Sequence, residues 1–185
     1  MTDNRTHRVA IVGAGAMGVM TGYHLFHPSV GVDFVVRPAR SAKMPRAYSL
    51  YSYDDGAIHD FGGFGVLTDP LDLAKADYDF VILAMDGASL SGDQGRILLT
   101  RIGQAIRQRD TVLIVGSIGI GLRELAIAAS GLPEDRVLSG RLGLLCHEIS
   151  DVALPLHAPT DPALLARSDF AMRHLSDVCS PCGST

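Results

Sequence analysis

The chain has 185 residues, of which 47% are hydrophobic and 19% charged, a composition typical of a globular protein that buries its own core. Its 16 Lys and Arg against 20 Asp and Glu leave a net charge of −4, which excludes the basic surface that nucleic-acid binding demands. No apolar run is long enough for a signal-peptide core or a membrane span, so we expect a cytoplasmic protein.

Strands and helices are predicted to alternate through most of the chain. Short apolar runs predict strands at 8–12, 32–36, 80–85, 111–115 and 137–142, with two more at 47–53 and 57–61 around a turn at 54–56. Apolar residues at helical spacing predict helices at 16–27, 93–107 and 122–130. This alternation is typical of a doubly wound parallel sheet of the Rossmann type, with helices on both faces.

The segment after residue 157 has a different character. Asp161 is followed by Pro162, and an N-cap residue with proline at the first helical position predicts a helix from here to about residue 177. We therefore expect residues 1–157 to form the sheet domain. Residues 158–185 are expected to be a short helical appendage and tail, the start of a C-terminal helical domain.

A glycine-rich segment joins the first predicted strand to the first predicted helix. It reads G-A-G-A-M-G, with glycines at 13, 15 and 18, and we call residues 13–18 the glycine loop. Gly13 allows a tight turn, Gly15 lets the backbone approach a pyrophosphate, and Gly18 lets the helix pack close to the strand. The anion would sit on the helix N-terminus. The sequence therefore predicts a dinucleotide site, the alternative being a structural glycine turn.

The end of the second strand distinguishes between dinucleotides. NAD and FAD sites carry an acidic residue there for the ribose hydroxyls, whereas this chain has Arg37, and Asp33 lies at the beginning of the strand. Arg40 and Lys43 follow, so the segment is suited to the 2′-phosphate of NADPH, the alternative being a solvated basic turn. Arg37 also argues against an S-adenosylmethionine methyltransferase, which would use an acid at this position.

Other candidate ligands and catalytic groups are scattered. Cys179 and Cys182 form a C-x-x-C pair, but a structural zinc ion needs four ligands and Cys146 is remote, so no metal site is predicted. The three cysteines are expected to be reduced thiols. His147 and Glu148 follow the last predicted strand and could face a nicotinamide, although such a pair is more often simply surface.

With these residues the chain resembles the N-terminal NADP-binding domain of the ketopantoate reductase (2-dehydropantoate 2-reductase) family. The matching segments are G-A-G-A-M-G at 13–18, V-V-R-P-A-R at 35–40, Y-D-F-V-I-L-A-M at 78–85, V-L-I-V-G-S-I-G at 112–119 and R-V-L-S-G at 136–140. The resemblance implies hydride transfer from NADPH to a small 2-oxo acid in pantothenate biosynthesis, with a homodimer as a possible assembly. The cofactor-binding residues it implies are Gly13, Ala14, Gly15, Ala16, Met17, Gly18, Arg37, Arg40, Met85 and Gly116.

The chain departs from the family pattern at two strand ends. Asp86 stands where the family usually carries a Lys, and Gly116 and Ser117 stand where it carries an Asn before a Gly. The family's catalytic Lys and substrate-binding Glu belong to a C-terminal helical domain, so the resemblance assigns no catalytic residue here. Two hypotheses follow: an NADPH-dependent oxidoreductase of this type, and a non-catalytic NADPH-binding module or truncated relative.

Overall fold

The computed structural model describes residues 7–141, 143–151 and 161–174. The predicted domain boundary at residue 157 lies outside these residues, as do Cys179 and Cys182. The chain divides into two compact units. The first unit comprises Met1–Arg46 and Gly63–Arg141, and the second comprises Ala47–Gly62 and Leu142–Thr185.

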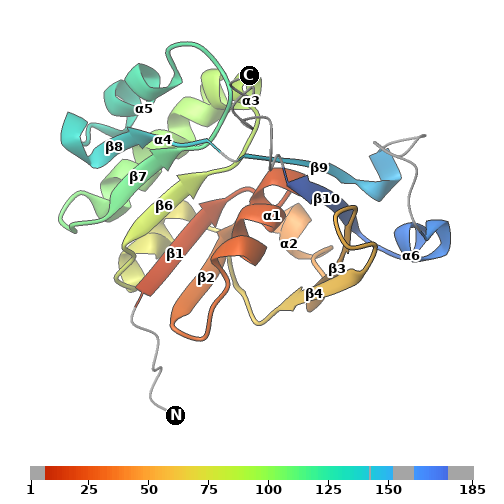
Figure 1. The fold of residues 1–185 in the computed structure, drawn as a ribbon. Helices are drawn as coiled ribbons and strands as arrows, with labels where there is room; N and C mark the ends of the chain where they lie inside the picture. The colour runs from red at the N-terminus through yellow and green to blue at the C-terminus, as the bar shows by residue number, and fades with distance from the viewer. Residues whose placement is uncertain (1–6, 142, 152–160, 175–185) are drawn as a thin grey trace, which may run out of the picture. The chain divides into compact units, whose positions relative to one another are not determined.

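A parallel sheet of six strands forms the centre of the first unit (Figure 1). The strands are β1 (His7–Val12), β2 (Val30–Val35), β5 (Gly65–Leu67), β6 (Phe80–Leu83), β7 (Val112–Val115) and β8 (Val137–Ser139). Their order, β5-β2-β1-β6-β7-β8, reverses direction between β1 and β6. In doubly wound sheets ligands bind at this switch point, outside the carboxyl ends of the strands. The predicted doubly wound parallel sheet is therefore confirmed.

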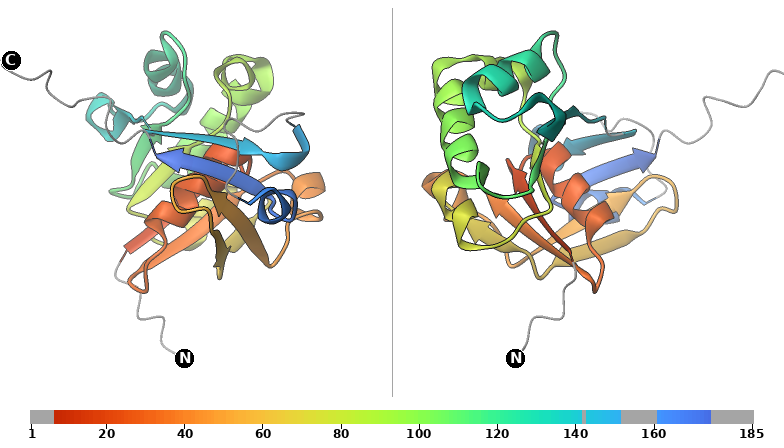
Figure 2. Two further views of the ribbon diagram at one scale, coloured as in Figure 1. Left: turned by 45° about the vertical axis from the view of Figure 1, so that its right-hand side comes forward. Right: turned by 90° about the vertical axis from the view of Figure 1, so that its left-hand side faces the viewer.

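Helices cover both faces of this sheet (Figure 2). One face packs against α4 (Asp93–Ile106), α5 (Leu122–Ser130) and the 3-10 helix Pro70–Lys75, and this layer holds the main apolar core. The other face carries α1 (Ala16–Leu25). The shorter helices of this unit are α2 (Pro38–Ser41), α3 (Gly87–Ser91) and the 3-10 turn Glu134–Arg136.

A buried carboxylate ties three segments of the first unit together. Asp33, in the middle of β2 opposite Ala10, is only 7% exposed. Its Oδ2 accepts hydrogen bonds from Arg8 Nη2 at 2.9 Å and from the Tyr78 hydroxyl at 2.7 Å. Burial, together with the hydrogen bond to Asp33, raises the pKa of Tyr78, so its hydroxyl stays protonated and donates. Asp33 is thus a structural acid within β2, and it does not lie at the beginning of the strand as the sequence predicted.

The second unit contains a four-stranded sheet in the order β4-β3-β10-β9. The predicted hairpin is present as β3 (Ala47–Ser52) and β4 (Ile58–Gly62), which pair antiparallel. Two strands from the far end of the chain complete the sheet: β9 (Leu144–Glu148), followed by the 3-10 turn Ile149–Asp151, and β10 (Phe170–His174). β10 pairs parallel with β3 and antiparallel with β9.

The prediction of one helix from Asp161 to about residue 177 is wrong. The helix starts as expected, because Asp161 Oδ1 accepts from the backbone N–H of Ala163 and of Leu164 at 2.9 and 3.1 Å. It ends early, however, so that α6 spans only Pro162–Ala166 and β10 follows. Asp169 redirects the chain: its N–H donates to Ser49 O at 2.8 Å and its Oδ2 accepts from Ser49 N at 2.9 Å. The C-terminal part is therefore a short helix with sheet strands.

Within the described ranges, no helix is both long enough and apolar enough to span a bilayer.

Candidate cofactor-binding site

The glycine loop makes the tight turn that the sequence predicts between β1 and α1. Gly13 has φ +104°, a conformation that favours glycine, and its N–H donates to Val35 O at 3.0 Å. A Cβ on Gly13 would lie 3.1 Å from Ala84 O, and a Cβ on Gly18 would overlap the Gly13 carbonyl oxygen. Gly13 and Gly18 are therefore required by the fold itself.

Gly15 differs from Gly13 and Gly18, because no contact with the described residues requires it to be glycine. It is the N-cap of α1 with an extended backbone, φ −84° and ψ −173°, and a Cβ there would meet no atom within 4 Å. The first turn of α1 carries no acidic side chain and Gly15 supplies no side-chain cap. An anion at the N-terminus of α1 would interact favourably with the backbone N–H groups there and with the helix dipole. The loop therefore fits a pyrophosphate.

The ends of the neighbouring strands lie directly beside the glycine loop. The N–H of Ala84 donates to Val12 O at 2.9 Å, and a Cβ on Gly13 would be 3.7 Å from the Met85 nitrogen. The N–H of Gly116 donates to Leu83 O at 3.0 Å, and a Cβ on Gly116 would come within 2.9 Å of the same oxygen. The structure therefore brings the loop, Met85 and Gly116 together at the carboxyl edge of β1, β6 and β7.

The two arginines after β2 have different surroundings. Arg37 is the N-cap of α2, and its exposed side chain makes no hydrogen bond or ion pair with the described part of the chain. Arg40 instead reaches the glycine loop, where its Nη2 donates to Ala14 O at 2.8 Å. Lys43 is exposed beyond α2. Of this basic segment, Arg37 is the cation available to an anionic ligand at the strand end.

Asp86, which departs from the family pattern, acts as a helix cap. Its Oδ1 accepts from the backbone N–H of Ser89 at 2.7 Å, which makes it the N-cap of α3. Hydrogen bonds from the hydroxyl and the N–H of Ser89 hold the pKa of Asp86 below its usual range, so the carboxylate is ionised at neutral pH. Sequence reasoning missed α3, although an Asp three residues before a Ser in a short polar stretch was the available signal.

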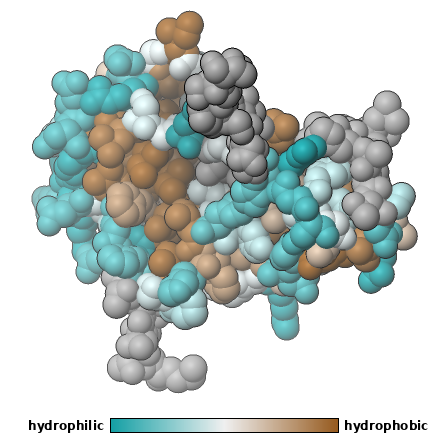
Figure 3. Space-filling view, viewed as in Figure 1, coloured by the Kyte–Doolittle hydropathy of each residue, from teal (hydrophilic) through white to brown (hydrophobic). Residues whose placement is uncertain are grey.

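The loop after β7 borders the same strand edge. Ser117 follows Gly116, and its Oγ is buried without a hydrogen-bond partner among the described residues. Ile118 and Ile120 are 84% and 104% exposed, and apolar atoms are visible at the top of the space-filling view, where this loop lies (Figure 3). A Cβ on Gly87 would overlap the Ile118 carbonyl oxygen, so the loop packs closely on the start of α3. This edge combines an ionised acid, an unpaired hydroxyl and apolar side chains.

His147 and Glu148 lie in β9 of the second unit rather than in a loop. The His147 Nε2 and the Tyr53 hydroxyl are 3.2 Å apart and share a hydrogen bond, and both residues are half-buried. Burial raises the pKa of the neighbouring Cys146 to about 11, so this thiol is protonated at neutral pH. His147 and Glu148 are therefore residues of a sheet strand, whereas the sequence favoured a surface position for them.

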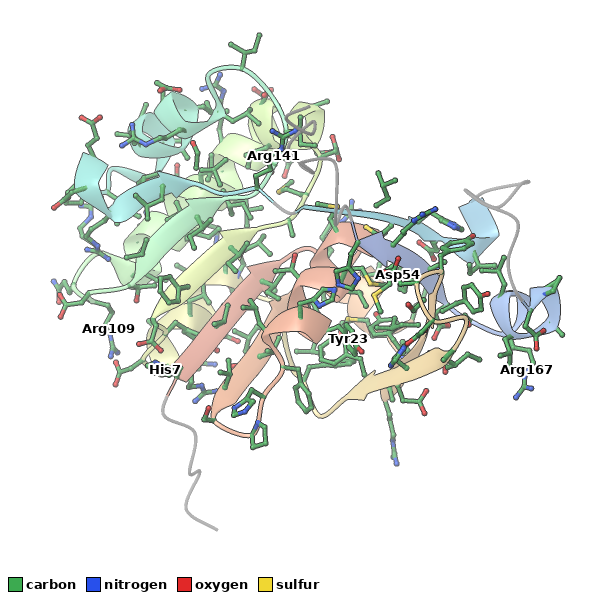
Figure 4. The ribbon with its side chains drawn as sticks, viewed as in Figure 1. His7, Tyr23, Asp54, Arg109, Arg141 and Arg167 are labelled. Carbon is green, nitrogen blue, oxygen red and sulfur yellow. The ribbon has the colours of Figure 1, made fainter. Side chains whose placement is uncertain are left out.

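Asp54 anchors the β3–β4 turn to the end of β10 within the second unit (Figure 4). Its Oδ2 accepts from the N–H of His174 at 2.9 Å and contacts His174 Nδ1 at 2.7 Å. The backbone hydrogen bond is the main cause that lowers the pKa of Asp54 below its ordinary value. Arg173 Nε, 3.9 Å from Oδ1, acts in the same direction.

We expect Asp54 to stabilise the protein above pH 4 and to lose this contribution as the pH falls. A carboxyl group with a depressed folded-state pKa stabilises the fold above its unfolded pKa of about 4, and the effect disappears as pH falls through the folded value. Thermal melts of wild type and Asp54→Asn at pH 7, 5 and 3 test this. The difference in stability between the two proteins, about 1 kcal/mol or less for this partly exposed group, should disappear toward pH 3. A difference that does not change with pH would contradict the assignment.

Comparisons with known proteins find similar folds among solved structures. No protein-family model and no curated protein matches the sequence. Among solved structures, the chain is similar to 2-dehydropantoate 2-reductase from Methylococcus capsulatus, with TM-score 0.59 and 19% identity over 90% of this chain and 45% of that one. It is also similar to NADP+-bound yersinopine dehydrogenase, with TM-score 0.56 and 16% identity over 78% of this chain and 37% of that one.

A third similar structure is D-mandelate dehydrogenase in complex with NADH, with TM-score 0.53 and 16% identity over 91% of this chain and 43% of that one. The chain thus spans less than half the length of each of these three structures. At these identities the likeness concerns the fold alone; one of the three structures holds NADP+ and another holds NADH.

Proposed function

We propose that the chain binds NADPH and supplies the cofactor site of an oxidoreductase resembling 2-dehydropantoate 2-reductase. The observation that carries the proposal is Arg37, an exposed arginine without a partner among the described residues at the carboxyl end of β2, beside a glycine loop that leaves room for a pyrophosphate. An arginine there matches a 2′-phosphate, whereas a ribose 2′-hydroxyl would favour an acid. The fold likeness to 2-dehydropantoate 2-reductases supports the reaction class.

The residues of the chain divide the work of holding the cofactor. The N-terminus of α1, with Ala16 and Met17, binds the pyrophosphate through backbone N–H groups and the helix dipole. Arg37 pairs with the 2′-phosphate through charge-assisted hydrogen bonds. Met85 and Gly116, on the neighbouring strand ends, border the nicotinamide half. When bound, NADPH would supply the hydride that reduces the carbonyl group of a small 2-oxo acid.

A second function, NADPH binding without turnover by this chain, is favoured by Asp86. Its carboxylate is ionised at neutral pH and stands at the end of β6, where it would repel the carboxylate of a 2-oxo acid. The two functions are separated by following NADPH absorbance with a panel of 2-oxo acids that includes ketopantoate. Substrate-dependent oxidation supports the reductase; binding without oxidation supports the module.

The preference for NADPH is tested directly at Arg37. Hydrogen bonds to charged groups are worth about 1.5 to 3 kcal/mol, so Arg37→Met should weaken NADPH binding about 10- to 150-fold and leave NADH binding nearly unchanged. Isothermal titration calorimetry with both cofactors measures this. Arg107→Met, which removes an exposed arginine at the C-cap of α4, is the matched control and should change neither affinity appreciably. Equal losses of NADPH and NADH affinity in Arg37→Met would remove the basis of the proposal.

A further inference from the structure

Arg40 makes a specific contact with the backbone of the glycine loop. Its Nη2 donates to the carbonyl oxygen of Ala14 at 2.8 Å, across 26 residues of sequence, and the bond is partly buried. Ala14 itself is only 3% exposed. A guanidinium bond to a carbonyl is charge-assisted and stronger than an ordinary backbone hydrogen bond. Arg40 is therefore committed to the loop before any ligand arrives.

The glycine loop needs such an outside partner because of its own geometry. The helical hydrogen bonds of α1 begin with the N–H of Val19 donating to Gly15 O at 2.9 Å, one residue after Ala14. Gly15 has no side chain that could cap the helix. If the N–H groups of the loop are to face a pyrophosphate, its carbonyls must turn away from the ligand and find donors elsewhere. Arg40 is the donor that the structure provides for Ala14.

The two arginines at α2, Arg37 and Arg40, differ in their partners. Arg37 is the N-cap, and its exposed side chain makes no hydrogen bond or ion pair with the described residues, whereas Arg40, three residues later, donates to Ala14 O. We infer that Arg40 is a positioning residue that sets the glycine loop for the pyrophosphate, whereas Arg37 alone discriminates for the 2′-phosphate. The inference rests on the proposed NADPH function and reassigns Arg40 from phosphate ligand to loop support.

Binding measurements with three probes separate these two roles. Arg40→Met keeps the unbranched stem and removes the donor, so it should weaken NADPH and NADH by the same factor, about 10-fold or more. Adenosine 2′-phosphate, which carries the 2′-phosphate and no pyrophosphate, should bind Arg40→Met as it binds the wild type. Arg37→Met is the matched control and should show the reverse pattern, losing NADPH and adenosine 2′-phosphate and keeping NADH. If Arg40→Met loses NADPH and adenosine 2′-phosphate but keeps NADH, Arg40 is a phosphate ligand and the inference is overturned.

A measurement on the cofactor-free protein tests the same inference independently. Amide hydrogen exchange of a peptide covering residues 13–20 should be faster in Arg40→Met than in the wild type and unchanged in Arg37→Met. Equal exchange in all three proteins would refute a positioning role. If the wild type binds neither NADPH nor NADH, the proposed function fails, while this exchange experiment still decides the role of Arg40.

Discussion

Replacing Gly15 by valine is expected to abolish NADPH binding while the protein still unfolds cooperatively. The extended backbone of Gly15, φ −84°, is accessible to any residue, and a Cβ there meets no protein atom within 4 Å. The added isopropyl group would instead fill the space above the N-terminus of α1, where the pyrophosphate is proposed to sit. Loss of two N–H contacts to a charged group amounts to about 3 to 6 kcal/mol, or more than about 100-fold in affinity.

Gly92→Val is the matched control for this substitution. Gly92 is the N-cap of α4 with a similar backbone, φ −73° and ψ 171°, and the nearest atoms to its Cβ would be 3.8 Å away. Both variants should lose only about 1 kcal/mol or less of stability, the cost of a poor N-cap. Calorimetric titration and thermal melting of the two proteins give the comparison. Retained NADPH affinity in Gly15→Val would mean that the glycine loop has a purely structural role.

Removing the Asp33 carboxylate is expected to give the largest loss of stability that we predict. Asp33→Ala leaves the Arg8 guanidinium and the buried Tyr78 hydroxyl without the acceptor that they share. Breaking a buried pair costs about 3 to 5 kcal/mol, and because the Arg8 side chain is 34% exposed we expect a value near the lower limit, about 3 kcal/mol. Urea unfolding at neutral pH measures the change.

An exposed ion pair of the same unit provides the reference for Asp33. Asp72 pairs with Lys75 at 2.8 Å, three residues apart in the 3-10 helix, and the Lys75 side chain is 75% exposed. Asp72→Ala should therefore cost about 1 kcal/mol or less. Tyr78→Phe, which removes one of the two donors to Asp33, should fall between them. A loss in Asp33→Ala no greater than that in Asp72→Ala would show that the buried network contributes little.

The glycine loop and the parallel sheet could be predicted from the sequence because their signals are local. Two glycines of the loop meet a structural requirement within a few residues, namely the positive φ of Gly13 and the close approach of Gly18 to the Gly13 carbonyl. Five of the six strands were predicted, and β5 (Gly65–Leu67) was missed because three residues are too few to show a strand pattern. To predict that Arg37 lies at the end of β2, it was enough to predict the bounds of the strand, which the structure places within two residues of the expectation.

Only the β3–β4 hairpin of the second unit could be predicted, because the other strands of its sheet pair with distant segments of the chain. Phe170, Ala171 and Met172 form an apolar run that fits a buried strand or a helix equally well, and the preceding Asp161-Pro162 start favoured the helix. The partner strand β3 lies about 120 residues earlier, as the bond between Ser49 and Asp169 shows. The contact of Arg40 with Ala14 was missed for the same reason, since both residues looked like ligand contacts when considered separately.

The pairing of β3 with β10 also sets the order in which the chain can be completed during synthesis. The six strands of the first sheet are all complete once Ser139 has emerged from the ribosome. One edge of β3, however, stays unpaired until Phe170–His174 emerges. Open strand edges recruit other chains, and such late, long-range pairing is slow. The nascent protein therefore passes through a stage in which one half is finished and an exposed edge awaits its partner, and this is where chaperone dependence and aggregation of translation-arrested chains should concentrate.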